Sequence, residues 1–263
     1  MTIPANRRRF LGLIATAPLG VAGVSTAARA AQAVAPVSPT PVPPPAAVAL
    51  TDDERRRLTD FPWLARYAQD NARVIATGKP VKLVFMGDSI TQGWPDKHPA
   101  FFAAEGRVCR GISGQTTPQM VLRMMADVIA LKPRAVHIMA GTNDIAGNTG
   151  PMTLQQTQDN LAAMAMLAKA SGIAVLLASV PPAARYYWRP GLDTVTPIAA
   201  INQWLASYAA THGHTFVDYH GAMQDGAGGM RPGLAYDGVH PTEAGYAVME
   251  QVLSPILAAK GFS

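Results

Sequence analysis

The chain has 263 residues, of which 49% are hydrophobic and 15% are charged. This composition suits one globular domain with a sizeable hydrophobic core and excludes a disordered or fibrous protein. The formal net charge is +5, but four of the basic residues and none of the acidic ones lie in residues 1–30, so the rest of the chain is close to neutral and lacks the basic surface of a nucleic-acid-binding protein.

Residues 1–30 have the features of an export signal. Their start is basic, their middle is mildly apolar and their end is rich in small residues. The run RRRFL at residues 7–11 resembles the twin-arginine signal, which exports proteins that have already folded. The apolar stretch that follows is shorter than the ~18 residues that a membrane-spanning helix needs. We therefore predict cleavage after Ala30 or Ala33, no membrane span in the mature protein and a periplasmic or secreted location.

A proline-rich segment separates this signal from the rest of the chain. Residues 34–48 read VAPVSPTPVPPPAAV, and so many prolines cannot supply the N–H groups of a regular hydrogen-bond ladder. We therefore predict an extended linker over residues 31–49 and one folded domain over residues 50–263. Thr51 and the two aspartates after it predict the start of an amphipathic helix, whose apolar residues recur at helical spacing at Leu58, Phe61, Leu64 and Tyr67.

Short apolar runs then alternate with longer amphipathic segments. Five runs have the length and composition of buried strands: KLVFMG at 82–87, RVCRGI at 107–112, AVHIMAG at 135–141, IAVLLASV at 173–180 and HTFVDYH at 214–220. Between and after them, capping residues, prolines and glycines delimit helices at about 117–131, 153–171, 196–211 and 242–260. This alternation predicts a parallel sheet of about five strands with helices on both faces.

Polar residues follow the predicted strands at the edge where such a sheet binds ligands. In chain order they are Ser89, Gly114, Asn143, Asp237 and His240. A serine hydroxyl becomes a nucleophile when a histidine removes its proton, and an acid fixes the tautomer of that histidine. The backbone N–H of Gly114 and the side-chain amide of Asn143 can stabilise an oxyanion. These residue types together predict acyl transfer through a covalent intermediate.

Four segments resemble, in order and approximate spacing, the sequence blocks of the SGNH hydrolase superfamily, also called GDSL-type esterases and lipases. They are GDSIT at 87–91, RGISGQTT at 110–117, GTNDIAGN at 141–148 and DGVHPTEAGY at 237–246. The resemblance implies a flavodoxin-like three-layer α/β/α fold with Ser89 as the nucleophile, His240 as the base and Asp237 as its orienting acid. It also implies that the N–H of Ser89 joins Gly114 and Asn143 in an oxyanion hole. The second and third segments look most like those of acetylhydrolases and carbohydrate esterases.

Simpler interpretations of these residues stay open at this stage. Ser89 can be a helix cap, Gly114 and Asn143 can be turn residues, and Asp237 and His240 can form a hydrogen-bonded surface turn. The sequence lacks the G-x-S-x-G elbow of α/β-hydrolases, the P-loop and the G-x-G-x-x-G fingerprint, which argues against those classes.

Other reactive residues are expected to have structural roles. Asp88 and Asp144 are expected to brace their loops by accepting backbone N–H bonds. Cys109 is the single cysteine, so no disulfide can form within the chain, and its apolar sequence neighbours predict a buried, inert thiol. The remaining histidines lack a metal-binding spacing and are expected to be structural or exposed: His98, His137, His212, His214 and His220. We therefore expect neither a metal nor another cofactor.

The leading functional hypothesis is a serine ester hydrolase that cleaves short acyl esters, mainly acetyl esters, including those on carbohydrate. The alternatives are a lysophospholipase or thioesterase, an acyltransferase on the same scaffold, and a non-catalytic glycan-binding protein. Tyr186, Tyr187 and Trp188 follow the fourth strand and are expected at the same edge of the sheet, where their rings can contact the substrate. Packing of these rings against the body of the domain is the alternative.

Overall fold

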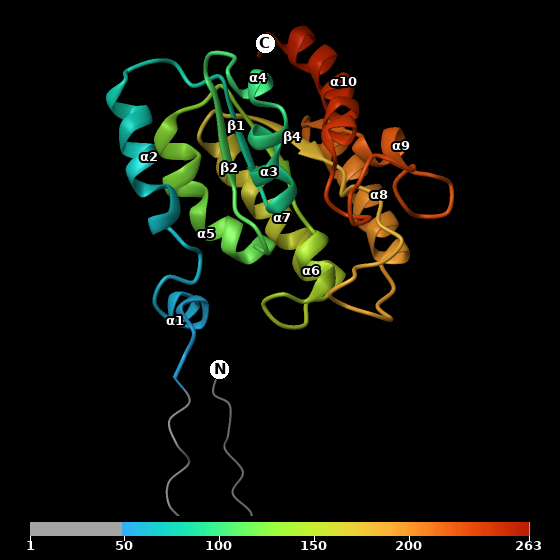
Figure 1. Cartoon of the computed structure of the whole chain (residues 1–263). Helices are drawn as coiled ribbons and strands as arrows, with labels where there is room; N and C mark the ends of the chain where they lie inside the picture. The colour runs from blue at the N-terminus through green and yellow to red at the C-terminus, as the bar shows by residue number, and fades with distance from the viewer. Residues whose placement is uncertain (1–48, 263) are drawn as a thin grey trace, which may run out of the picture. The chain divides into compact units, whose positions relative to one another are not determined.

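Five parallel strands form the central sheet of the computed structural model, which describes residues 49–262 (Figure 1). The strands are β1 (Leu83–Gly87), β2 (Arg107–Gly111), β3 (Ala135–Met139), β4 (Ala174–Ala178) and β5 (Thr215–Val217). Their order in the sheet is β2-β1-β3-β4-β5, with Leu83 opposite Arg107 on one side and Ala135 on the other. The chain therefore reverses its direction across the sheet between β1 and β3, which is the place where such sheets bind ligands.

Helices cover both faces of this sheet, so the predicted three-layer α/β/α fold is confirmed. α3 packs beside α10, whereas α5 packs beside α7 and α7 beside α8. Figure 1 shows α2 and α5 on one side of the strands and α10 on the other. The helices are α1 (Asp52–Thr59), α2 (Ala65–Ala76), α3 (Ser89–Lys97), α4 (Pro99–Phe102), α5 (Thr117–Asp127), α6 (Thr142–Ala146), α7 (Leu154–Ala170), α8 (Val195–His212), α9 (Tyr219–Met223) and α10 (Glu243–Lys260), with a 3-10 turn, η1, at Ile129–Leu131.

The N-terminal part of the chain remains a matter of prediction. The predicted export signal at residues 1–30 and residues 31–48 of the predicted linker lie outside the described residues. Within residues 49–262, no helix combines the length and the apolar character that crossing a bilayer requires.

The amphipathic helix predicted after Thr51 is two helices in the structure. α1 ends at Thr59 and α2 begins at Ala65. Between them Trp63 has a left-handed backbone (φ 57°), and the Asp60 carboxylate accepts hydrogen bonds from the N–H groups of Leu64 and Ala65 at 2.8 and 3.0 Å. The apolar residues that suggested one continuous helix, Leu58, Phe61 and Leu64, are exposed, so no buried face holds the segment in one piece.

Other boundaries differ by a few residues. The fifth strand is shorter than predicted because the Asp218 side chain accepts the N–H of Gly221 at 2.9 Å and starts α9. The predicted helix at 117–131 ends at Asp127 and continues only as the turn η1. The predicted capping box of Thr153 and Gln156 is confirmed at the start of α7, and Thr242 caps α10.

Two glycines allow α3 to lie very close to the sheet. A Cβ atom at Gly87 would overlap Thr91 Oγ1, and one at Gly111 would overlap Gln92 N and lie 2.8 Å from Asp88 O. Gly87 ends β1 and Gly111 ends β2, so the first turn of α3 is seated directly on the carboxyl ends of both strands. Only residues without a side chain fit at these two contacts.

Gly111→Ala should therefore separate α3 from β2. We expect a loss of about 3 kcal/mol or more in the free energy of unfolding, because the atoms that the new Cβ meets belong to the backbone and cannot turn aside. Urea denaturation measures this loss. Gly78→Ala is the matched control: nothing lies within 4 Å of its Cβ, and only its left-handed backbone (φ 63°) is strained, which costs about 1–2 kcal/mol. Equal losses in the two variants would contradict the close seating of α3.

Candidate active site

Ser89 is the first residue of α3 and lies two residues after the end of β1. Asp88 caps the helix by accepting the N–H of Ile90 at 3.0 Å, as predicted for a loop brace. The turn from strand to helix presents Ser89 at the carboxyl edge of the sheet. The first N–H groups of a helix have no acceptor within the helix, so the N–H of Ser89 is available to a ligand.

His240 and Asp237 meet Ser89 from a loop 151 positions further along the chain. The Oγ atom of Ser89 lies 2.9 Å from Nε2 of His240. Nδ1 of the same ring lies 2.7 Å from Oδ2 of Asp237. Oδ1 of Asp237 accepts the backbone N–H groups of Val239 and His240 at 2.9 and 2.8 Å. The carboxylate therefore holds both the loop and the ring, and it leaves Nε2 directed at the serine hydroxyl.

The pKa values of Asp237 and of the neighbouring Asp88 are shifted in opposite directions. Partial burial raises the pKa of Asp237, but the hydrogen bonds from His240 and Val239 outweigh it and hold the pKa below its usual value. Asp237 therefore stays charged at neutral pH and can orient an imidazole and stabilise its cation. Complete burial raises the pKa of Asp88 to about 6, against the lowering effects of the Ile90 N–H and of His240.

Gly114 and Asn143 lie on the other side of Ser89. Gly114 has a left-handed backbone (φ 75°), and its N–H donates to no acceptor within residues 49–262. The Nδ2 atom of Asn143 donates to the carbonyl of Gln115 at 3.0 Å and to Oδ2 of Asp88 at 3.4 Å, so a bound oxyanion would replace the longer of these two bonds. The structure thus brings both predicted donors to the serine, with Asn143 also holding the loop that carries Gly114.

Ser89 opens into a cavity of about 200 Å³. It is lined by Ser89, Ser113, Gly114, Asn143, Asn148, Tyr187, Trp188 and His240. Sequence reasoning missed Ser113 and Asn148. Nδ2 of Asn148 donates to Oδ1 of Asn143 at 2.8 Å and to the carbonyl of Gly114 at 3.3 Å, so it ties the two predicted oxyanion donors together. Its place at the end of the GTNDIAGN segment was the signal that could have found it.

The aromatic residues after β4 divide between the two predicted roles. Tyr186 is buried and does not line the cavity, so the packing alternative describes it. Trp188 stacks on Tyr186 with ring centres 4.9 Å apart, and its other neighbours include the ring of His240 at 6.3 Å. Tyr187 is 60% exposed and stands edge-on to Trp188. Tyr187 and Trp188 therefore form one rim of the cavity, with Tyr186 as their support.

Two residues expected to be structural, Asp144 and His137, are buried in the fold. Asp144 accepts the backbone N–H of Thr117 at 3.1 Å and so braces the start of α5, as predicted. His137 is buried in β3 with Nε2 2.9 Å from the Tyr219 hydroxyl, and burial lowers the pKa of His137 to about 3. Within residues 49–262, no three His, Cys, Asp or Glu side chains are grouped to hold a metal ion.

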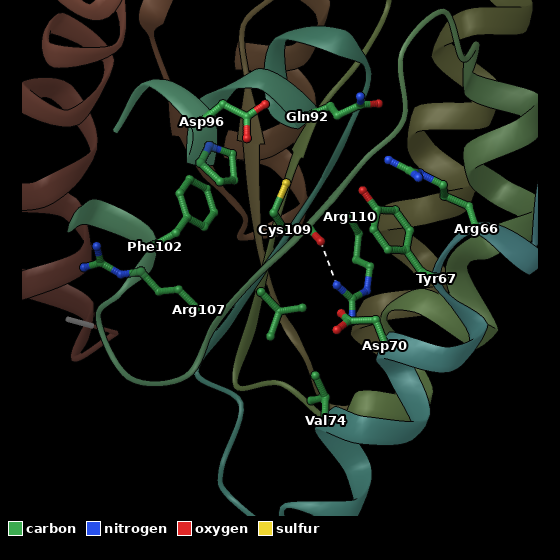
Figure 2. Close-up of a pocket in the computed structure, with 12 residues that line it drawn as sticks. Arg66, Tyr67, Asp70, Val74, Gln92, Asp96, Phe102, Arg107, Cys109 and Arg110 are labelled. Atoms are coloured by element: carbon green, nitrogen blue, oxygen red, sulfur yellow. Dashed lines mark hydrogen bonds and ion pairs between the residues drawn. The ribbon is translucent and has the colours of Figure 1, made fainter. Parts of the chain in front are cut away.

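Cys109 lies in a separate cleft on β2 (Figure 2). The predicted apolar setting was wrong, because charged side chains such as Arg110, Asp70 and Asp96 line the same cleft, and the residue as a whole is partly exposed. The thiol donates to the carbonyl of Thr91 at 3.3 Å. Burial of the sulfur raises the pKa of Cys109 to about 11, so the thiol stays protonated and unreactive at neutral pH, as predicted.

Known proteins resemble the part of the chain that carries this site. A model of the GDSL-like lipase/acylhydrolase family matches residues 85–248. Esterase TesA of Pseudomonas aeruginosa is 32% identical over 174 residues, which cover 62% of this chain and 80% of that protein. A crystal structure assigned as an acylhydrolase of Bacteroides fragilis is 41% identical, with a TM-score of 0.73 over 78% of this chain and 99% of that one. A GDSL-like lipase of Bacteroides thetaiotaomicron is also 41% identical, with a TM-score of 0.72 over 76% of this chain and 100% of that one.

The buried charge of Asp88 should appear in the pH dependence of stability. Asp88→Asn keeps an oxygen that accepts the Ile90 N–H but cannot ionise. The folded pKa of Asp88, about 6, lies above the value of 3.8 for a free carboxyl. The folded wild type therefore gains a proton first as the pH falls, and its stability rises relative to the variant. We expect a gain of about 2–3 kcal/mol from pH 8 to pH 4 in urea denaturation. A constant difference across this range would contradict the burial of a charged Asp88.

Proposed function

The chain belongs to the GDSL-like lipase/acylhydrolase family and is a carboxylic ester hydrolase, and from this premise we propose that it cleaves short-chain acyl esters, mainly acetyl esters, through an acyl-enzyme on Ser89. The observation that carries the proposal is the continuous series of contacts from Ser89 Oγ to His240 Nε2 at 2.9 Å and from His240 Nδ1 to Asp237 Oδ2 at 2.7 Å. We also propose that the alcohol of this ester is a sugar or a similar alcohol.

The reaction follows from this order of contacts. His240 removes the proton of the Ser89 hydroxyl while the oxygen attacks the ester carbonyl, and Asp237 stabilises the imidazolium that forms. Collapse of the tetrahedral intermediate breaks the bond to the alcohol oxygen, which takes the proton from His240 Nε2. A water molecule then attacks the acyl-enzyme with the same histidine as base, and the acid is released with Ser89 restored.

The negative charge of each tetrahedral intermediate needs hydrogen-bond donors. The N–H groups of Ser89 and Gly114 and the side-chain amide of Asn143 are the donors that we propose. Both backbone groups are held in place before substrate arrives, so they need no rearrangement in the transition state. Asn148 contributes indirectly because its amide group fixes Asn143 and the carbonyl of Gly114.

The size of the cavity supports a short acyl group. Its volume of about 200 Å³ is below the ~300–1,000 Å³ that is usual for pockets that enclose a whole ligand. Asn148, Ser113 and Gly114 supply polar walls, which suit an acetyl group better than a long aliphatic chain. The exposed ring of Tyr187 and the partly buried ring of Trp188 offer flat faces at the rim, which favour a sugar or another ring on the alcohol side.

A substrate panel tests the proposal as a whole. p-Nitrophenyl esters from acetyl to palmitoyl, an acetyl thioester, a lysophospholipid and acetylated sugars should be compared by kcat/KM. We expect the acetyl esters to be the best substrates. Highest activity on the lysophospholipid or the thioester would overturn the acetyl assignment. Product analysis with a sugar acceptor distinguishes hydrolysis from acyl transfer, and a folded protein without turnover on any ester would leave glycan binding as the function.

Ser89→Ala should abolish turnover. Loss of a triad serine typically lowers kcat by about 10⁵–10⁶-fold, and a fluorophosphonate probe that labels the wild type should no longer react. Ser113→Ala is the matched control for labelling, because Ser113 is a second hydroxyl in the same cavity. Mass spectrometry of the labelled peptide reads the site. Label on a residue other than Ser89, or turnover retained in Ser89→Ala, would remove the assignment.

Asn143→Ala should lower kcat by about 10²–10³-fold, with a smaller effect on KM, because one oxyanion donor is lost. The variant also loses the bond from Asn143 Nδ2 to the Gln115 carbonyl, so thermal unfolding must be measured beside the kinetics. Gln115 itself is held from its other end by Arg123 and by the carbonyl of Pro62. A folded variant with unchanged kcat would show that Asn143 only braces the loop.

A further inference from the structure

A second, larger cleft is lined in part by Tyr236, whose ring stacks on that of His240. It has a volume of about 600 Å³ and is lined by Lys97 at the end of α3, by Tyr236, and by Thr242, Glu243 and Ala244 at the start of α10. None of these residues carries a role in the reaction described above. Tyr236 is the residue that connects the cleft to the catalytic site.

Tyr236 contributes to the cleft and also contacts the ring of His240. Its ring lies almost parallel to the ring of His240, with an angle of 16° and ring centres 5.7 Å apart. The side chain is 67% exposed, so the face turned away from His240 is open. The backbone holds it in place, because the N–H of Tyr236 donates to the carbonyl of His240 at 3.1 Å and a β-bridge joins Ala235 to Pro241.

The chemistry of the ester places the alcohol on this side. The carbonyl oxygen must face the donors at Ser89, Gly114 and Asn143, whereas the departing alcohol oxygen must receive its proton from His240 Nε2. The rest of the alcohol therefore extends along the His240 side of the cavity. Tyr236 is the side chain stacked on that ring, and the cleft begins behind it.

We infer that this cleft binds the alcohol part of the substrate and that the alcohol is a sugar, an inference that rests on the proposed function. Tyr236 offers a flat face of the kind on which the apolar face of a sugar ring stacks. Lys97 and Glu243 are exposed, and neither forms an ion pair with another residue of the described chain. Their charged ends can donate to and accept from hydroxyl groups, and the ring of Tyr236 supplies an apolar face beside them.

Hydrogen bonds at the first turn of α10 fix the position of Glu243. The carbonyl of Glu243 lies 2.8 Å from Nε2 of His98, and the capping bond from the N–H of Gly245 to Thr242 Oγ1 holds the first turn of α10. The hydroxyl of Thr242 in turn donates to the carbonyl of Gly233 at 2.6 Å. The cleft therefore has a rigid floor at the start of α10 and two free charged side chains at its rim.

Two acetate esters that differ only in the alcohol test the inference: ethyl acetate and methyl 6-O-acetyl-glucoside. Tyr236→Ala should raise KM for the sugar ester about fivefold to tenfold, the usual size of one aromatic stacking contact. The ratio of kcat/KM for the sugar ester to that for ethyl acetate should fall by the same factor. Tyr236→Phe should rescue the KM, because it keeps the ring, and Glu243→Gln should raise KM in the same direction as Tyr236→Ala.

Met166→Ala is the control, because Met166 is exposed on α7, away from the cleft. Unfolding curves of all variants check that the fold is intact. The deacetylated product, methyl glucoside, should inhibit ethyl acetate hydrolysis competitively in the wild type and more weakly in Tyr236→Ala.

Two results would overturn the subsite. If Tyr236→Ala lowers kcat equally on both esters with the ratio unchanged, Tyr236 positions His240 and the cleft is not used. If KM for the sugar ester does not change, the sugar does not contact Tyr236. Failure of the proposed function looks different, because the wild type would then hydrolyse neither acetate ester, whereas good turnover of ethyl acetate with no effect of Tyr236 rejects the subsite alone.

Discussion

The contact between α3 and α10 is the interaction on which the site depends. Ser89 begins α3 and His240 precedes α10 by a few residues, so the 2.9 Å between their reacting atoms is set by how these two helices pack. Tyr246 of α10 donates its hydroxyl to the carbonyl of Ile90, one residue after the serine, at 2.7 Å. Trp94 of α3 lies stacked between Phe101 and Tyr246 and donates to Glu250 at 2.9 Å. A large buried aromatic cluster thus fixes the loop of Ser89 relative to the loop of His240, although the two loops are far apart in the sequence.

The opposite side of the cavity depends on a buried polar network. Arg123 is fully buried, and it donates to Gln115 Oε1 at 2.8 Å, to Asp127 at 2.6 Å and to the carbonyl of Arg110 at 3.1 Å. Gln115 follows Gly114 and accepts from Asn143. A buried network of this kind is costly unless every member is satisfied, and then it fixes one arrangement of the loop. The proposed oxyanion donors Gly114 and Asn143 are therefore held by a network that extends into the core.

The sequence predicts the architecture well because a short run of apolar residues indicates a strand that is buried in the core. All five runs form strands, and the residues that follow them meet at one edge, since parallel strands carry their carboxyl ends to the same side. Ser89, Asp237 and His240 could be found because their residue types have few other reasons to converge. Asn148 could also have been found, because it ends the GTNDIAGN segment. Ser113 and Tyr236 could not, because no sequence pattern reports which loop side chain lines a cavity or stacks on His240. The division of the N-terminal helix at Asp60 depends on a local hydrogen bond, which periodicity does not report.

The two sides of the cavity differ in exposure, and this difference bears on specificity. On the proposed acyl side Asn143 is buried, and bonds to Gln115 and Asn148 hold it, so contacts that extend into the core fix this part of the cavity. On the proposed alcohol side the exposed rings are Tyr187 at the cavity and Tyr236 at the second cleft, and they are carried by separate loops. A substitution on the acyl side changes the packing of the domain, whereas a substitution at the exposed rings leaves that packing almost unchanged. Variation of the alcohol is therefore the easier route to a new substrate on this scaffold, and the acyl group is the part of the substrate that the fold itself constrains.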